Sequence, residues 1–150
     1  MHIEPGVVDG AKIVLSRSQA DAYQETYIGG TRSFGMDPPE FKWDTMLDDS
    51  RLKVGAIELE LVPAPGHSPE SVCFYHRAYK ALICGDVVFE MNTGRVDFPG
   101  GSGETLKESI EGLARLDIEY LLPGHMGVVA GAKIVKANFD FIRSNVFPWL

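Results

Sequence analysis

The stretch Val62-Pro-Ala-Pro-Gly-His-Ser-Pro-Glu-Ser71 decides the fold, because it is a stiff turn between two strand-like segments. Residues 56–62 lead into it with alternating apolar side chains, and residues 71–75 leave it as a second short strand. Two prolines and a glycine surround His67, so its backbone has little freedom. A histidine held in this way has a preset direction, which suits a metal ligand or a catalytic base.

Two later segments carry partners of the same kind. Asp86 stands in Cys84-Gly-Asp86 and His125 stands in Pro123-Gly-His125, each after a strand-like run and each preceded by glycine, as His67 is. Glycine lets the backbone turn sharply and lets neighbouring loops approach closely. One such pair is usually only a turn. Three of them at strand ends predict a site where two imidazoles and a carboxylate meet, a common ligand set for zinc, iron or manganese.

The remaining sequence predicts strands mixed with amphipathic helices. The expected elements are, in chain order, a strand over 12–15, a helix from Ser16 to Gly29-Gly30, an excursion over 31–44, a strand over 45–48, a hairpin over 53–62 bent at Gly55, a hairpin over 71–84 with His76 at its exposed tip, a loop over 90–103, a helix over 104–116, a strand over 118–122 and a helix over 130–146. This order predicts one α/β or α+β layered domain over residues 1–150, with helices covering a sheet. The excursion is either a lid that faces the substrate or a flap packed on its own core.

Composition narrows the class of function. The chain has 150 residues and a net charge of −7, which argues against binding to nucleic-acid backbone. It contains no run of about 18 apolar residues and no leader pattern, so we expect a cytoplasmic protein that does not enter a membrane. Cys73 and Cys84 lie inside strand-like runs and are expected to be buried reduced thiols. These features leave a small molecule as the expected substrate.

The three motifs resemble those of the metallo-β-lactamase-fold hydrolases, in particular the glyoxalase II-like branch. Ala64–Ser71 resembles the third motif of this family, Leu82–Asp86 the fourth and Leu122–Met126 the fifth, and Gly94–Gly101 resembles a segment common in the glyoxalase II-like branch. The resemblance implies an αβ/βα sandwich, of which the chain carries mainly the C-terminal half. It also implies that His67 binds a first metal, that Asp86 bridges two metals, and that His125 binds the second.

The N-terminal segment departs from the family pattern. The first metal motif of the family reads His-x-His-x-Asp-His, and the best match places His2 at its second histidine, Glu4 at its aspartate and Pro5 at its last histidine. By this resemblance His2 is a further metal ligand and Glu4 a ligand or proton acceptor. The alternative is a terminus with no role in the site.

The resemblance implies a metal-dependent hydrolase in which one or two zinc ions, or iron or manganese, activate water for attack on an ester or thioester. It leaves two alternatives open. One is a catalytically impaired domain that acts through association, and the other is a mononuclear-iron enzyme resembling persulfide dioxygenases, with His2, His67 and Asp86 as ligands. Because half of the sandwich is expected to be missing, we expect an apolar sheet face covered by a second copy or by a partner chain, unless the chain is a truncation.

Overall fold

The structure is a computed structural model that describes residues 12–38, 42–47 and 51–150. Contacts within the chain group it into two compact units, Met1–Asp49 and Ser50–Leu150. The expectation of one domain over residues 1–150 stays a prediction. No helix in the described part of the chain is long and apolar enough to cross a membrane.

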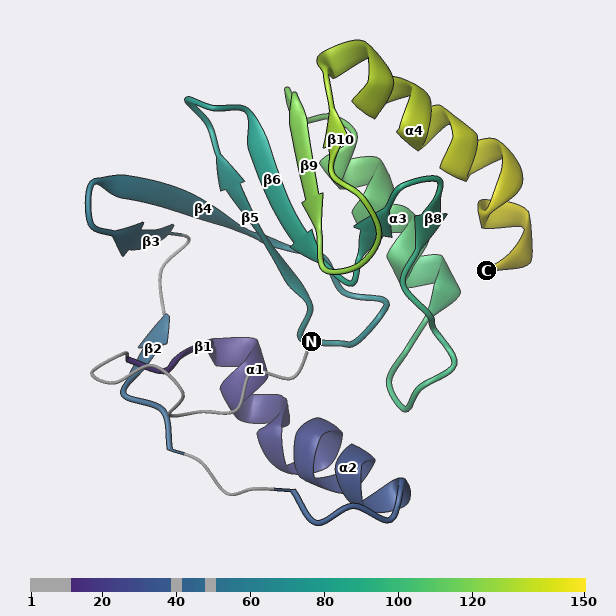
Figure 1. The fold of residues 1–150 in the computed structure, drawn as a ribbon. Coiled ribbons are helices and arrows are strands. Elements are labelled where there is room, and N and C mark those ends of the chain that lie inside the picture. Colours follow the sequence, from purple (N-terminus) through teal and green to yellow (C-terminus); the bar gives the residue numbers. More distant parts are fainter. Residues whose placement is uncertain (1–11, 39–41, 48–50) are drawn as a thin grey trace. The chain divides into compact units, whose positions relative to one another are not determined.

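The first unit combines one helical run with a small parallel strand pair (Figure 1). Strand β1 (Val14–Ser16) pairs in parallel with β2 (Thr45–Leu47). Ser16 caps helix α1 (Arg17–Ala22) through the capping box that the sequence predicts, since its hydroxyl accepts from Gln19 N while the Gln19 side chain accepts from Ser16 N.

The helical run does not end at Gly29-Gly30, as the sequence analysis predicted. It continues as a π-helix (Tyr23–Gly29) and as α2 (Gly30–Ser33). Gly29 has ordinary helical angles, with φ −65° and ψ −44°, so it does not terminate the helix. The chain leaves the helix at Gly35, where φ is 70° and Gly35 N donates to Arg32 O, because glycine adopts this left-handed backbone without a steric penalty.

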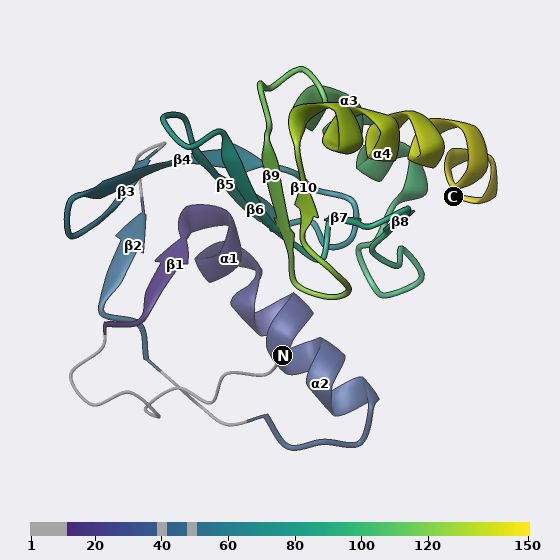
Figure 2. The same ribbon diagram turned by 45° about the horizontal axis from the view of Figure 1, so that its top comes forward.

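The second unit is built on a six-stranded mixed sheet (Figures 1 and 2). Its order is β10-β9-β6-β5-β4-β3, and every neighbouring pair is antiparallel except β6 with β9. The strands are β3 (Arg51–Val54), β4 (Ile57–Pro63), β5 (Val72–His76), β6 (Ala81–Gly85), β9 (Tyr120–Pro123) and β10 (Val129–Ala130). Because β4, β6 and β9 run in the same direction, the residues that follow them emerge at one edge of the sheet.

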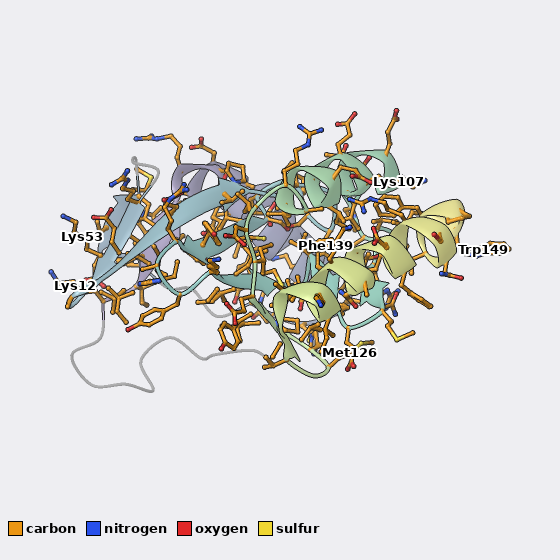
Figure 3. All side chains as sticks on the ribbon, turned by 90° about the horizontal axis from the view of Figure 1, so that it is seen from above. Lys12, Lys53, Lys107, Met126, Phe139 and Trp149 are labelled. Atoms are coloured by element: carbon orange, nitrogen blue, oxygen red, sulfur yellow. The ribbon has the colours of Figure 1, made fainter. Side chains whose placement is uncertain are left out.

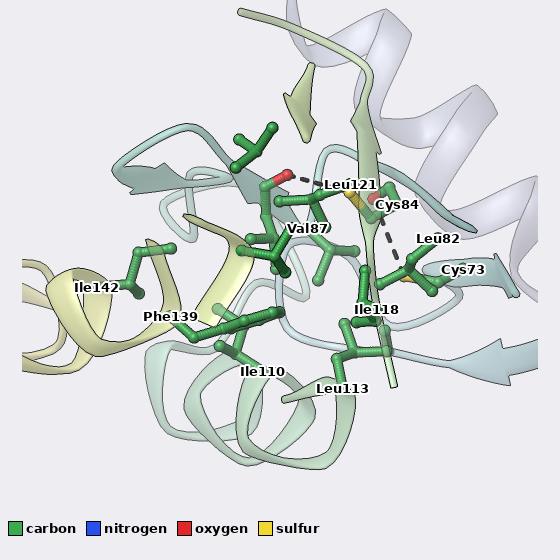
Figure 4. Packing of buried hydrophobic residues seen from close by; sticks show 14 of the residues in the cluster. Cys73, Leu82, Cys84, Val87, Ile110, Leu113, Ile118, Leu121, Phe139 and Ile142 are labelled. Atoms are coloured by element: carbon green, nitrogen blue, oxygen red, sulfur yellow. Dashed lines mark hydrogen bonds between the residues drawn. The ribbon is translucent and has the colours of Figure 1, made fainter. Parts of the chain in front are cut away.

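Two helices, α3 (Gly103–Leu113) and α4 (Ala132–Asn145), cover one face of this sheet. The apolar stripe predicted for the first helix is buried, and the second helix contributes Phe139, which points toward the sheet in Figure 4. A short 3₁₀ turn, Phe147–Trp149, follows α4 and leaves Trp149 projecting into solvent, as Figure 3 shows. The core comprises Ala64, Cys73, Tyr75, Leu82, Cys84, Val87, Val88, Leu106, Ile110, Leu113, Ile118, Leu121, Val129, Val135, Phe139 and Ile142.

The predicted α/β layering, with helices on a sheet, is confirmed, but several boundaries differ. The expected loop over 90–103 contains a short strand, β8 (Asn92–Thr93), which forms a small hairpin with β7 (Val88–Phe89). Helix α4 starts two residues late because residues 129–130 pair with β9. His76 is the half-buried last residue of β5 rather than an exposed tip, and its ring stacks on Tyr79.

Candidate metal centre

The turn that carries His67 is held by its own serines and by helix α3. The Ser68 and Ser71 hydroxyls lie 2.8 Å apart, and Ala64 N donates to Ser71 O at 2.9 Å. Ser109 Oγ of α3 donates to Pro65 O at 2.7 Å, while the backbone of Gly66 packs directly against that of Leu106. These contacts fix the turn at both ends, so the direction of His67 is set by the fold, as the sequence analysis expected.

The ring of His67 is fixed by a hydrogen bond to the backbone. Its Nδ1 lies 2.7 Å from Arg95 O. A carbonyl oxygen only accepts, so Nδ1 carries the proton and Nε2 presents a lone pair. The side chain is 23% exposed. A histidine whose other ring nitrogen donates to a carbonyl is arranged as metal-ligating histidines are.

Asp86 follows strand β6 and lies between the two histidines. Its Oδ2 is 4.0 Å from His67 Nε2, and its Oδ1 is 3.4 Å from His125 Nε2. Gly124 makes this closeness possible, because a Cβ at that position would stand 2.6 Å from Asp86 Oδ1. Gly124 N also donates to Gly85 O at 2.7 Å, which ties the two strand ends together.

The three side chains form two pairs that share one carboxylate. Two ligands bound at about 2.0–2.2 Å to a tetrahedral ion are about 3.4 Å apart. The pair of His125 and Asp86 has this spacing, and the pair of His67 and Asp86 is wider. Within the described ranges, no group of three or more His, Cys, Asp or Glu side chains is arranged around a single ion position. The donor types and the shared carboxylate therefore fit metal ions, and each pair needs further ligands to complete a coordination sphere.

Aromatic rings border both histidines. The Phe89 ring of β7 meets His125 edge-on with centroids 5.8 Å apart, and Phe98 meets His67 edge-on at 6.3 Å. The Arg95 guanidinium lies over the Phe98 ring at 4.5 Å and pairs with Asp97. One aromatic ring therefore contacts each histidine, and the exposed guanidinium of Arg95 lies over the ring beside His67.

The structure brings His67, Asp86 and His125 together, whereas His2 and Glu4 lie outside the described residues. The roles assigned to all five side chains stay predictions. Sequence reasoning gave no role to Arg95, whose carbonyl orients His67, although it singled out the Gly94–Gly101 segment. It also missed Asn138, a buried polar residue on the apolar face of α4. An asparagine beside an apolar stripe was the available signal.

The chain belongs to the metallo-beta-lactamase superfamily, whose family model matches residues 9–125. It is 40% identical over 83 residues to the probable metallo-hydrolase YqgX of Bacillus subtilis, which is 55% of this chain and 37% of that protein. It is 41% identical over 59 residues to the hydroxyacylglutathione hydrolase GloC of Haemophilus influenzae, which is 39% of this chain and 28% of that protein. The chain thus spans well under half the length of these relatives. The match to a hydroxyacylglutathione hydrolase, or glyoxalase II, confirms the resemblance to the glyoxalase II-like branch that the sequence motifs indicated.

Solved structures agree on the fold. The B3 metallo-beta-lactamase BLEG-1 matches with a TM-score of 0.70 and 26% identity over 83% of this chain and 61% of that chain. TTHA1623, solved in a di-iron-bound form, matches with a TM-score of 0.66 and 22% identity over 93% of this chain and 65% of that chain. The metallo-β-lactamase-like fold predicted from the sequence is therefore confirmed. This fold implies metal ions, whose identity in this chain it leaves undetermined.

Proposed function

We propose that this chain supplies a metal-binding half-site of a hydrolase that cleaves an ester or thioester of a small molecule. The observation that carries the proposal is that the Nε2 atoms of two histidines face opposite oxygens of one carboxylate, Asp86. A divalent ion held there would lower the pKa of bound water toward about 7 and polarise a carbonyl. Hydroxyacylglutathione hydrolase activity in a relative supports a thioester as the first substrate to test.

Residues around the site orient the candidate metal ligands and form their immediate surroundings. The Arg95 carbonyl keeps the proton of His67 on Nδ1, so that Nε2 is free to bind. Asp86 offers one oxygen to each histidine, which suits a bridging carboxylate. Phe89 and Phe98 each place the edge or face of an apolar ring beside one histidine. Under this proposal His2 adds a ligand, and Glu4 accepts the proton of the attacking water.

Metal content is the first test. We expect zinc, iron or manganese in the purified full chain, and we expect His67→Ala and His125→Ala each to lower Zn²⁺ affinity by more than tenfold. His76→Ala is the matched control, since His76 lies at the far end of β5 and stacks on Tyr79. A wild-type chain without metal uptake, or equal losses in all three variants, would contradict the proposal.

Activity separates the chemical alternatives. Hydrolysis of a hydroxyacylglutathione thioester that stops when a chelator removes the metal is expected. One iron per chain with oxygen consumption on a persulfide, and no hydrolysis, would instead favour iron-dependent oxidation.

A second candidate function is association through the sheet face opposite α3 and α4. Leu82 and Leu121 are buried under the helices, whereas Ile83 and Tyr120 alternate with them and are 41% and 43% exposed. Exposed apolar rows of this kind favour a covered interface with a second copy or a partner. Light scattering tests this proposal. A dimer that Ile83→Lys dissociates is expected, and a monomeric wild-type chain would refute self-association.

A further inference from the structure

Helix α4 is connected to the two histidines through the β7–β8 hairpin and the residues that follow it. It starts at Asn138, which is 5% exposed on a helix face otherwise packed in the core. Its Oδ1 accepts from Met91 N at 2.6 Å, and its Nδ2 donates to Phe89 O at 3.0 Å. The side-chain amide thus satisfies one backbone donor and one backbone acceptor of the β7–β8 hairpin.

The two groups that Asn138 holds flank the tip of this hairpin. Met91 there has a φ of 55°, a left-handed conformation that a side chain makes unfavourable. A turn of this kind persists where its surroundings fix it, and the amide of Asn138 provides such contacts. Replacing it with an apolar group leaves Met91 N and Phe89 O without these partners, and the Phe89 carbonyl lies in a buried setting.

The hairpin that Asn138 holds contacts both histidines of the site. The Phe89 ring lies against His125, with centroids 5.8 Å apart. After β8 the chain passes through Gly94, whose N donates to Val87 O at 3.3 Å, and reaches the Arg95 carbonyl that accepts from His67 Nδ1. Residues 88–95 are therefore the segment through which α4 can fix both imidazoles.

We infer that Asn138 is a positioning residue of the metal centre. By holding residues 88–95 in place, it favours the Nδ1-protonated form of His67 and fixes the position of the His125 ring. The expected effect of Asn138 on metal affinity rests on the proposed function. Its expected effect on the tautomer of His67 does not require a bound metal. A purely structural asparagine would affect stability without affecting the tautomer of His67.

The test compares Asn138→Leu, which keeps the volume and removes both hydrogen bonds, with Val135→Ala. Val135 is buried on the same helix but makes no hydrogen bond to the hairpin, so its variant loses packing alone. Imidazole ¹⁵N spectra of the metal-free full chain, taken about two units above the ordinary histidine pKa of about 6.5, report the protonated nitrogen. Zn²⁺ titration of the same samples reports affinity.

We expect His67 to be protonated at Nδ1 in the wild type and in Val135→Ala, and to lose this preference in Asn138→Leu. We also expect Asn138→Leu to bind Zn²⁺ about tenfold more weakly, the size of effect seen when partners behind metal ligands are removed. Asn138→Asp, which keeps the acceptor for Met91 N, takes its place if Asn138→Leu fails to fold.

Unchanged His67 tautomer in the Asn138 variant, or an equal change in Val135→Ala, would overturn the inference. A wild-type chain that binds no Zn²⁺ would overturn the proposed function instead. The tautomer comparison would still decide the role of Asn138 in that case.

Discussion

Replacement of Gly124 by alanine should affect metal affinity more than it affects the stability of the fold. The added Cβ would stand 2.6 Å from Asp86 Oδ1, while the nearest backbone atoms, Gly85 C and O, are 3.1 and 3.2 Å away. The severe clash is with the end of a side chain that can rotate, and the backbone contacts are only tight. The carboxylate must move by roughly 0.8 Å to reach an ordinary contact of about 3.4 Å.

This displacement acts on the atom that faces His125 at 3.4 Å. Displacement of a ligand or its support typically lowers metal affinity by about 10–100-fold, or about 1.4–2.7 kcal/mol. The fold should lose less, about 1 kcal/mol, because the main clash is relieved by rotation of Asp86. We therefore expect Gly124→Ala to lower Zn²⁺ affinity strongly and the free energy of unfolding of the metal-free chain only weakly.

Zn²⁺ titration calorimetry and urea unfolding of the metal-free chain measure the two effects. Gly127→Ala is the matched control, since a Cβ there lies in the same loop and meets only Glu90 Oε2 at 3.1 Å. Wild-type affinity in Gly124→Ala would refute the role given to Asp86. A loss of more than about 3 kcal/mol in the metal-free chain would show that the backbone, and not the carboxylate, limits this position.

Three further predictions follow from the same structure. Gly94→Ala places a Cβ in severe overlap with the backbone oxygen of Asp86, which cannot move away as a side chain can. We therefore expect a loss of more than about 3 kcal/mol in the free energy of unfolding by urea, in contrast to Gly124→Ala, and a smaller loss would mean that the hairpin can shift. The hydrogen bond from Arg143 lowers the pKa of Glu111 below its ordinary value of 4.5, so the pair stabilises the fold above about pH 4.5 and loses this effect as the pH falls through the lowered pKa. Both side chains are more than a third exposed, so Arg143→Met should cost no more than about 1 kcal/mol at pH near 6. The cost should shrink steadily as the pH falls below about 4.5 and Glu111 becomes protonated, and a cost that does not change with pH would contradict the assignment. Burial raises the pKa of the Cys84 thiol to about 12, so an alkylating reagent should modify it only as fast as the chain unfolds; rapid alkylation of the native chain would contradict this burial.

The sequence was sufficient for the elements whose pattern is local. The apolar spacing in α3 reports which side of that helix is buried, and the capping box at Ser16 reports where a helix starts. The alternation over residues 57–61 predicts a strand, but not its buried side, since Ile57 is exposed and Leu59 and Leu61 are only half-buried. Boundaries that depend on distant contacts were not predictable in this way. Residues 129–130 belong to a strand because β9 lies beside them, and the hairpin of β7 and β8 makes two hydrogen bonds at its tip with the distant Asn138 of α4.

The candidate site also has features that follow from local sequence and features that depend on distant contacts. Three Gly-His or Gly-Asp dipeptides, each after a strand-like run, pointed to His67, Asp86 and His125 from the sequence alone. This was possible because the residue types of a turn are adjacent in the chain. Their order around Asp86, with one histidine on each oxygen, was decided by the parallel pairing of β6 with β9, which no local pattern encodes.

The amino-acid sequence by itself determined the family, the candidate ligand types and the stiff turn at His67, since these depend on residue identity and short spacing. Only the tertiary structure decided which nitrogen of His67 is free and what holds it there. That choice depends on the Arg95 carbonyl, 28 residues away in the chain, and on a hairpin braced from α4. A tautomer is set by the partner of the opposite ring nitrogen, and such a partner is chosen by folding rather than by neighbours in sequence.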